Sequence, residues 1–206
     1  MNLFTLDNLF LLLTGLTAIY LLWRFYTRWS REKKVYDLYY GMGFLVLLVS
    51  GLLLIFRGLG ILVSPYVLTV ASLIPLGISM GIAEQYFPQW KKAFKWFALV
   101  GFLTIALFSI AGIEIGRKIS VPLFHGVAGL VIFLGPFFAK KAAKGFWWVG
   151  IGGLLIGLGG IALAFISMGA QLLFFSPALV MLILTPLLLL MTLAFTYGFV
   201  KDIKAA

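Results

Sequence analysis

Long apolar runs alternate with short polar gaps along the chain, and the gaps hold most of the charged residues. Seven apolar runs of about 17–25 residues match the hydrocarbon thickness of a bilayer at the rise per residue of an α-helix. This length predicts helices, because a membrane strand needs only about 10 residues and a helix satisfies its own backbone groups. The predicted helices cover residues 9–25, 39–56, 65–87, 94–113, 121–139, 146–168 and 177–199.

Composition supports a single all-α integral membrane domain over residues 1–206. The chain is 63% hydrophobic with a mean hydropathy of +1.14, which is more apolar surface than a soluble domain can bury. The longest polar gap is 26–37, so no extramembrane domain is expected. Residues 1–8 lack the basic start of a signal peptide, and we expect the first run to stay as a helix. The absence of cysteine excludes disulfides and thiolate chemistry.

The distribution of lysine and arginine predicts the orientation. Of the 16 residues, 13 fall on one side of the predicted helices and only Arg57, Arg117 and Lys118 on the other. By the positive-inside rule the first side is cytoplasmic, the N-terminus is outside and the C-terminus inside, in a plasma membrane. All six tryptophans flank the same side. The positive-inside rule and attraction to anionic lipid at the cytoplasmic face therefore explain the net charge of +10, and binding of nucleic acid is not expected.

An internal repeat is predicted between residues 41–86 and 150–197. At a shift of 109, Gly41, Gly43, Leu45, Gly51, Leu54, Phe56 and Gly60 match Gly150, Gly152, Leu154, Gly160, Leu163, Phe165 and Gly169. After small length changes, Ser64-Pro65 matches Ser176-Pro177, and Leu73, Pro75, Leu76, Met80, Ala83 and Tyr86 match Leu184, Pro186, Leu187, Met191, Ala194 and Tyr197. Repeat A would cover about 9–87 and repeat B about 121–199, with 94–113 as a linker helix. Three helices plus a linker give both repeats one orientation, which is a parallel 3+1+3 repeat.

This predicted architecture resembles that of the SWEET sugar transporters and the PnuC vitamin transporters. The resemblance is one of architecture, and the parallel repeat itself indicates a site at the interface of the two triplets. The Pro-Gln motif of the wider SWEET clan occurs only at Pro88-Gln89, in a loop, and the two asparagines, Asn2 and Asn8, lie outside the helices. A sugar pocket needs several convergent polar groups, so a sugar is not the expected ligand. Microbial rhodopsins share the size and orientation, but the last predicted helix has no lysine for retinal.

Two ionisable residues inside the predicted helices are candidates for a ligand or transport site. His125 is the only histidine and lies near the outer end of its helix. It suits either a proton relay or a neutral hydrogen bond to a neighbouring helix. Glu84 lies about one turn from the cytoplasmic end of its helix. It suits either ion coupling or a pair with Lys91 or Lys92.

Paired prolines and nearby hydroxyls give a second group of candidates. Pro75 and Pro186 hold matching positions in the two repeats, and a mid-helix proline frees a carbonyl and kinks the helix. Interrupted helices in corresponding halves indicate a transport site. Ser79 and Thr192 lie near them and either face that site or bond to their own backbone. Glycine spacings such as Gly77 to Gly81 favour close helix packing.

Glu114, Arg117 and Lys118 form the third group, in a predicted outer loop. Separations of three and four residues favour a local ion pair, and the alternative is a ligand entrance above His125. No metal site, cofactor or catalytic constellation is predicted, so we expect no enzyme activity. The expected function is a transporter or ligand-binding bundle for a weakly polar or lipophilic molecule. The alternative is an accessory or scaffold subunit with a membrane-protein or homo-oligomeric partner.

Overall fold

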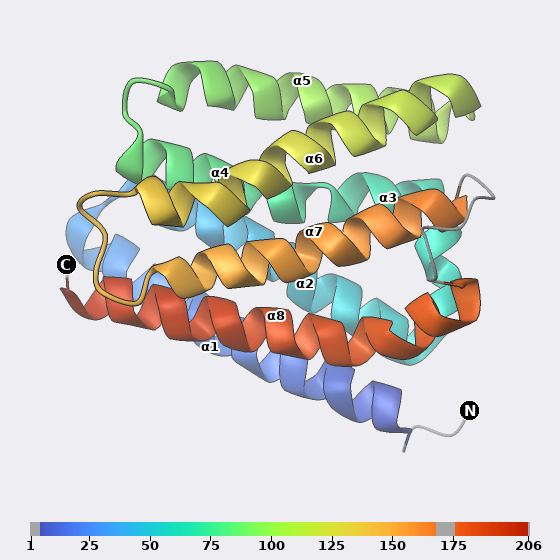
Figure 1. The fold of residues 1–206 in the computed structure, drawn as a ribbon, viewed down its shortest axis with the longest axis horizontal. Coiled ribbons are helices and arrows are strands. Elements are labelled where there is room, and N and C mark those ends of the chain that lie inside the picture. Colours follow the sequence, from blue (N-terminus) through green and yellow to red (C-terminus); the bar gives the residue numbers. More distant parts are fainter. Residues whose placement is uncertain (1–4, 168–175, 206) are drawn as a thin grey trace.

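The computed structural model describes residues 5–167 and 176–205, where all regular secondary structure is helical (Figure 1). In chain order the elements are α1 Leu6–Glu32, α2 Val35–Arg57, the 3-10 helix η1 Leu59–Val63, α3 Pro65–Ala71, α4 Leu73–Tyr86, α5 Lys91–Ile110, α6 Glu114–Phe138, α7 Trp147–Ser167 and α8 Pro177–Ala205. The prediction of an all-α chain is confirmed for these residues.

Six stretches of the described chain are long and apolar enough to cross a membrane, with α3 and α4 taken together as one. They coincide with six of the predicted helices. The remaining prediction, 146–168, falls on α7, which covers 21 residues and is apolar over Trp147–Gly160, the part whose side chains the structure describes. Residue 168, and Gly169 of the predicted repeat, lie outside the described residues. The helices of the described chain are therefore compatible, by length and composition, with a membrane-embedded bundle, and the count of seven spans stays a prediction.

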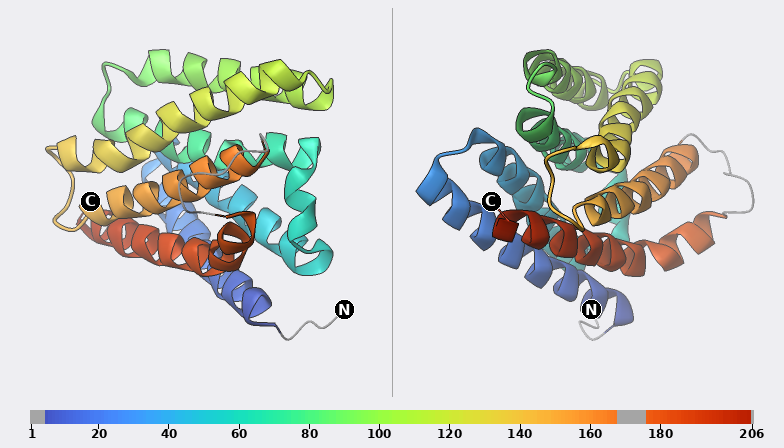
Figure 2. Two further views of the ribbon diagram at one scale, coloured as in Figure 1. Left: turned by 45° about the vertical axis from the view of Figure 1, so that its right-hand side comes forward. Right: turned by 60° about the vertical axis from the view of Figure 1, so that its left-hand side comes forward.

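The main helices pack as a closed ring in the order α1, α2, α4, α6, α7 and α8, with α8 returning to α1. Outside this ring, α5 packs on α6 and α4 and also contacts α3 (Figures 1 and 2). The first and last helices of the chain are consequently neighbours. Any site on the α1–α8 seam is built from residues far apart in the sequence.

The helices extend into the polar gap 26–37 beyond their predicted ends at 25 and 39, because α1 continues to Glu32 and α2 begins at Val35. Lys33 adopts a left-handed conformation, with φ of 54°, and donates its backbone N–H to the carbonyl of Trp29 at 2.8 Å. This contact closes the last turn of α1, and the chain reverses within two residues. The gap is thus a tight helical hairpin.

The predicted outer loop around Glu114 is also helical. Since α6 begins at Glu114, Arg117 and Lys118 lie on its first turns. Pro122 lies inside the helix, about two turns after its start. A carboxylate in the first turn of a helix is stabilised by the partial positive charge of that end, which favours the earlier start.

The two predicted kinks differ in the structure. A break at Ser72 separates α3 from α4, three residues before Pro75, whose missing N–H leaves a carbonyl of the preceding turn without its usual donor. The Ser72 hydroxyl donates to the carbonyl of Thr69 at 2.7 Å. In contrast, α8 continues as one helix through Pro186. The residues 65–87, predicted as one helix, therefore form two.

Aromatic side chains fill the region where α1, α2, α8 and the segment before α7 meet. Six of them are almost fully buried: Phe25, Tyr40, Phe44, Phe146, Phe195 and Phe199. The Phe199 ring lies 4.7 Å from Tyr40 and 5.1 Å from Phe25 between centroids. Such tilted and edge-to-face pairs add to the free energy gained from burial. At this end, buried aromatic side chains fill the interior of the ring.

Candidate functional site

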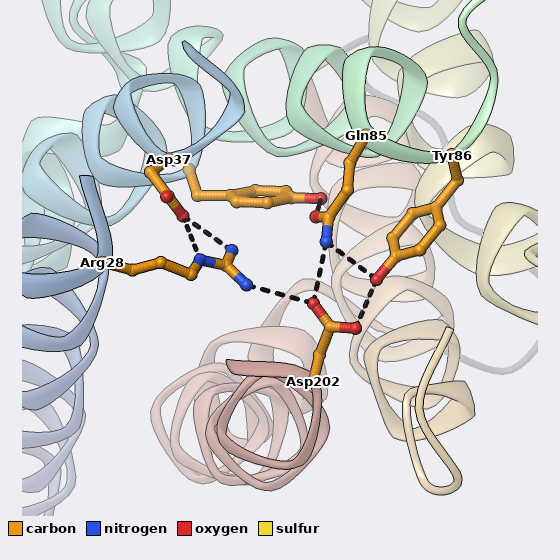
Figure 3. A network of polar contacts seen from close by, with 6 residues as sticks. Arg28, Asp37, Gln85, Tyr86 and Asp202 are labelled. Carbon is orange, nitrogen blue, oxygen red and sulfur yellow. Dashed lines mark hydrogen bonds and ion pairs between the residues drawn. The ribbon is translucent and has the colours of Figure 1, made fainter. Parts of the chain in front are cut away.

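Lysines and arginines gather at the end of the bundle where α1 and α8 end and α2, α5 and α7 begin (Figure 1). This end, which carries 13 of the 16 basic residues, is called the basic end below. A buried polar network lies here beside the aromatic cluster. Its members are Arg28 from α1, Asp37 and Tyr40 from α2, Gln85 and Tyr86 from α4, and Asp202 from α8 (Figure 3).

An ion pair between Arg28 and Asp37 forms the first part of the network. The Arg28 Nε and Nη2 atoms donate to Oδ1 of Asp37 at 2.8 and 2.6 Å. Arg28 is 3% exposed and Asp37 1% exposed, so water screens the pair very little. The hairpin at Lys33 places the two residues opposite each other, and the N-terminus of α2 favours the carboxylate. The Arg28 guanidinium also lies 5.0 Å from the Tyr36 ring centroid, within cation–π range.

Asp202 gathers donors from two other helices. Its Oδ2 atom accepts from Nη1 of Arg28 at 3.3 Å and from Nε2 of Gln85 at 2.9 Å. Its Oδ1 atom accepts from the Tyr86 hydroxyl. A fourth contact, in which the Tyr40 hydroxyl donates to Oε1 of Gln85 at 2.9 Å, ties α2 to α4. The network therefore joins α1, α2, α4 and α8 in a region where an unpaired polar group would be costly.

The predicted candidate Glu84 lies one residue from the network but outside it. Its carboxylate pairs with Lys95 at 2.8 Å and with Lys91 at 3.7 Å, both at the start of α5. The predicted pairing with Lys91 is confirmed, and the second partner is Lys95, one helical turn further along α5. Because both lysines are about half exposed, the pairs hold α5 weakly against α4.

Near the prolines, both predicted hydroxyls bond to their own helix. The Ser79 hydroxyl donates to the carbonyl of Pro75 at 2.7 Å, and that of Thr192 to Leu189 at 2.9 Å. Both hydroxyls therefore already donate their proton to a backbone carbonyl of their own helix. Within the described chain, no hydrogen bond or ion pair connects any two of Glu84, His125, Ser79 and Thr192.

On α6, His125 is partly buried, and its Nδ1 atom has no hydrogen-bond partner among the described residues. Glu114 and Lys118 form the predicted ion pair, at 3.3 Å, on the first turns of the same helix. Both residues are exposed, and Arg117 lies beside them. Among these charges, Glu114 and Lys118 thus form a pair on the protein surface.

An apolar groove of about 330 Å³ lies on the seam between α1 and α8. It is lined by Leu13, Leu16, Thr17 and Tyr20 of α1 and by Leu189 and Leu193 of α8. The Thr17 hydroxyl donates to the carbonyl of Thr14 at 2.8 Å, so the groove offers very little polarity. Its volume lies at the lower end of the range of about 300–1,000 Å³ for small-molecule sites. The lining suits an apolar occupant.

Two polar contacts hold the same seam on either side of the groove. At the start of α1, Asp7 accepts a hydrogen bond of 2.5 Å from Thr185 of α8, whose side chain is fully buried. At the basic end, Arg28 and Asp202 form the second contact. In sequence, the groove residues fall between these two contacts on both helices. The seam is therefore held at each end by a polar contact, called a pin below, and is apolar between the two pins.

Sequence reasoning missed the network. Arg28 counted only as a topological charge, and Asp37 and Asp202 were not singled out. One signal was present: aspartate is rare here, with residues 7, 37 and 202 as the three in the chain. An acidic residue among basic ones at a helix end needs an explanation, which here is a buried partner.

Known proteins offer no guide to this geometry. Comparison of the chain with protein-family models, with curated proteins and with solved structures finds no match. The buried network and the α1–α8 groove are the features on which a function can be proposed.

Proposed function

We propose that the chain is a plasma-membrane protein that binds and transports a weakly polar or lipophilic small molecule through the seam between α1 and α8. The observation that carries this proposal is the apolar groove, which is pinned by polar contacts at both ends. The groove lies open at the surface of the bundle, since Leu16 and Leu193 are 53% and 47% exposed, so a lipophilic molecule could enter it from the bilayer.

The packing order of the helices supports a two-fold internal repeat. Exchange of α1 with α6, α2 with α7 and α4 with α8 converts each neighbouring pair of the ring into another neighbouring pair. Under this exchange α1–α8 becomes α6–α4, and α5 is left over, as a 3+1+3 repeat requires. The seam that carries the groove is then one of two contacts between the triplets.

Matching glycines support the same repeat. A Cβ atom on Gly43 would lie 3.0 Å from the carbonyl oxygen of Ile74 on α4. One on Gly152 would lie 2.5 Å from the Phe195 ring on α8. Each glycine therefore allows the second helix of its triplet to approach the third closely. The polar network has no such counterpart, because Phe146 and Val149 occupy the positions that match Asp37 and Tyr40.

In the proposed orientation the basic end faces the cytoplasm. Seven crossings place the N-terminus outside and the C-terminus inside, with Arg24 and the other cations near anionic headgroups. The Arg24 guanidinium donates a hydrogen bond of 3.1 Å to the hydroxyl of Tyr20, which lines the groove. We propose no catalytic activity, cofactor or nucleic-acid partner.

Photolabelling tests the proposal. The purified protein in phospholipid vesicles would be treated with a diazirine-bearing fatty acid, and the crosslinked residues mapped by mass spectrometry. We expect crosslinks to concentrate on Leu16, Leu189 and Leu193, and Leu16→Trp to abolish most of them by filling the groove. Leu123→Trp is the matched control, since Leu16 and Leu123 are 53% and 52% exposed. Crosslinks spread evenly over the lipid-facing helices would contradict binding.

Transport is tested separately. Vesicles with the protein should exchange a labelled fatty acid between leaflets faster than empty vesicles, and Leu16→Trp should remove the difference. Specific labelling without faster exchange would leave a binding protein and reject transport.

A second function, as an accessory or scaffold subunit, is favoured by the aromatic cluster, which fills the ring near the basic end. A solid interior suits a structural part better than a wide pathway. A stoichiometric partner, retained through purification in mild detergent and disrupted by single substitutions on one exposed helix face, would support this function. A monodisperse monomer that labels in the groove would speak for the first.

A further inference from the structure

The buried network has unequal numbers of opposite charges. One guanidinium, that of Arg28, faces the carboxylates of Asp37 and Asp202, and all three residues are at most 5% exposed. With every group ionised, the network holds one surplus negative charge. Asp202 lies in the last turn of α8, and Tyr86 is the last residue of α4. Helix C-termini carry partial negative charge, so these two ends do not offset the surplus, whereas the N-terminus of α2 offsets part of it at Asp37.

One carboxylate oxygen of the network, Oδ2 of Asp37, has no hydrogen-bond partner among the described residues. Oδ1 of Asp37 accepts two hydrogen bonds from Arg28, whereas Oδ2 of the same carboxylate is buried and has no partner among the described residues. In contrast, both oxygens of Asp202 accept hydrogen bonds, from Tyr86, Gln85 and Arg28. A buried carboxylate oxygen without a donor is costly. Oδ2 of Asp37 is thus the one network carboxylate oxygen at which a positive species can be added without the loss of an existing bond.

We propose that the network is a proton-binding site and that Oδ2 of Asp37 takes up one proton from water at the basic end. The proton adds to a lone pair of that oxygen, hydronium leaves as water, and the charge of the network falls from one negative to zero. The described residues supply no group of three histidine, aspartate or glutamate side chains of the kind that holds a metal ion. A proton, which needs a single oxygen, fits the donor set.

The charged and titratable groups that face Asp37 are few. Arg28 and Glu32 come from α1, Tyr36 and Tyr40 from its own helix and Asp202 from α8. From α4, Gln85 is uncharged, and Tyr86 donates its hydroxyl proton to Asp202. Glu32 is exposed and adds a further negative charge nearby, which also favours proton uptake. Apart from Asp37, the site therefore has one fixed cation, Arg28, and two carboxylates, of Asp202 and Glu32, that attract a proton.

Proton uptake would shift the strongest ion pair of Arg28 from Asp37 on α2 to Asp202 on α8. With Asp37 ionised, the shorter contacts of Arg28, at 2.6 and 2.8 Å, join α1 to α2, and the longer one, at 3.3 Å, joins α1 to α8. Once Asp37 is neutral, Asp202 is the only anion left in the network for Arg28. The proton thereby strengthens the pin between α1 and α8 at the basic end. This inference depends on the network alone and not on a ligand in the groove.

Infrared spectroscopy tests the site, because a carboxylic acid has a C=O stretching band that a carboxylate lacks. The full chain with Asp7→Asn would be used, so that the network holds its only two aspartates. Spectra would be compared between alkaline and acidic pH over the range in which the protein stays folded. We expect a carboxylic-acid band that appears on acidification, shifts when aspartate is ¹³C-labelled, and is lost in Asp37→Asn.

Two further chains complete the test. Glu84→Gln, a matched carboxyl-to-amide change outside the network, should retain the band. Loss of the band in Asp202→Asn with retention in Asp37→Asn would overturn the assignment, as would a band that aspartate labelling does not shift. The isotope measurement needs no substitution within the network, so the proposal stays testable if Asp37→Asn does not fold. Absence of any labelled-aspartate band over the whole folded pH range also rejects it.

Discussion

Arg28 of α1 and Asp202 of α8 are 174 positions apart in the chain, and their side chains meet in a buried hydrogen bond of 3.3 Å. The contact brings the first and last helices together at the basic end of the bundle. Arg28 also pairs with Asp37, and Asp202 with Gln85 and Tyr86, so one pair of residues links four helices. The stability of the bundle and the closure of its seam are therefore coupled through a small polar core.

Removal of the Asp202 carboxylate should destabilise the protein strongly. Asp202→Ala removes the acceptor of the Tyr86 hydroxyl and one acceptor each of Arg28 and Gln85 in a buried region. Loss of one partner of a buried ion pair costs about 3–5 kcal/mol. Unfolding in detergent, followed by circular dichroism, should show this decrease. Asp202→Asn, which keeps an acceptor oxygen and balances the remaining charges, should be milder. Glu114→Ala, which breaks only an exposed pair with Lys118, should leave the unfolding midpoint unchanged.

Close packing of α4 against α2 should depend on Gly81. A Cβ atom there would lie 2.3 Å from the Tyr40 ring, which is fully buried and cannot move aside. Gly81→Ala should lower the free energy of unfolding by about 1–3 kcal/mol through overpacking. Gly126→Ala, on the open face of α6, meets no atom within 4 Å and should be neutral or slightly stabilising. Equal midpoints for the two variants would refute the packing of α4 on α2.

The contact between Asp7 and Thr185, which holds the start of α1 against α8, should depend on the Thr185 hydroxyl. Thr185→Val removes the hydrogen bond to Asp7 with little change in shape and should cost about 1 kcal/mol. Backbone amides near the start of α1 should then exchange hydrogen faster, which mass spectrometry can measure. In Thr192→Val, the lost bonds lie within α8, so exchange in α1 should stay as in the unmodified protein. Faster exchange of α1 in both variants would show that the effect is not specific to the pin.

The orientation can be tested directly because the chain has no cysteine. Lys144→Cys places a thiol at the basic end, and Glu114→Cys places one on an exposed turn of α6 at the opposite end. By the positive-inside rule, a membrane-impermeant maleimide should label Glu114→Cys in intact cells and Lys144→Cys only after permeabilisation. The reverse pattern would invert the proposed topology.

The helices were predictable because apolar run length fixes them. Residues 65–87 and 177–199 fall on helices that begin at Pro65 and Pro177 as predicted. Helix ends beyond the apolar runs were predicted poorly, since Glu32, Glu114 and Asp202 lie in helical turns that hydropathy does not mark. Those turns depend on end charges and on packing with other helices.

The candidate site was predictable only in part. The pairing of Glu84 with Lys91 follows from local spacing across one loop, and sequence reasoning found it. The backbone bonds of Ser79 and Thr192 also follow from a local rule, by which hydroxyls in apolar helices reach the carbonyl a turn earlier. The partnership of Arg28 with Asp202 has no local signature, because the two residues meet only after the ring of helices closes.

The sequence by itself determined the helical class of the chain: apolar runs of membrane length, separated by basic gaps, satisfy their backbone groups as helices. Tertiary structure decided which charges became buried partners. Arg28 resembles its exposed basic neighbours in the sequence, and only the packing of α1, α2 and α8 removes it from water and gives it two carboxylates. The physical reason is that charge pairing acts through distance in space, whereas hydropathy is read along the chain.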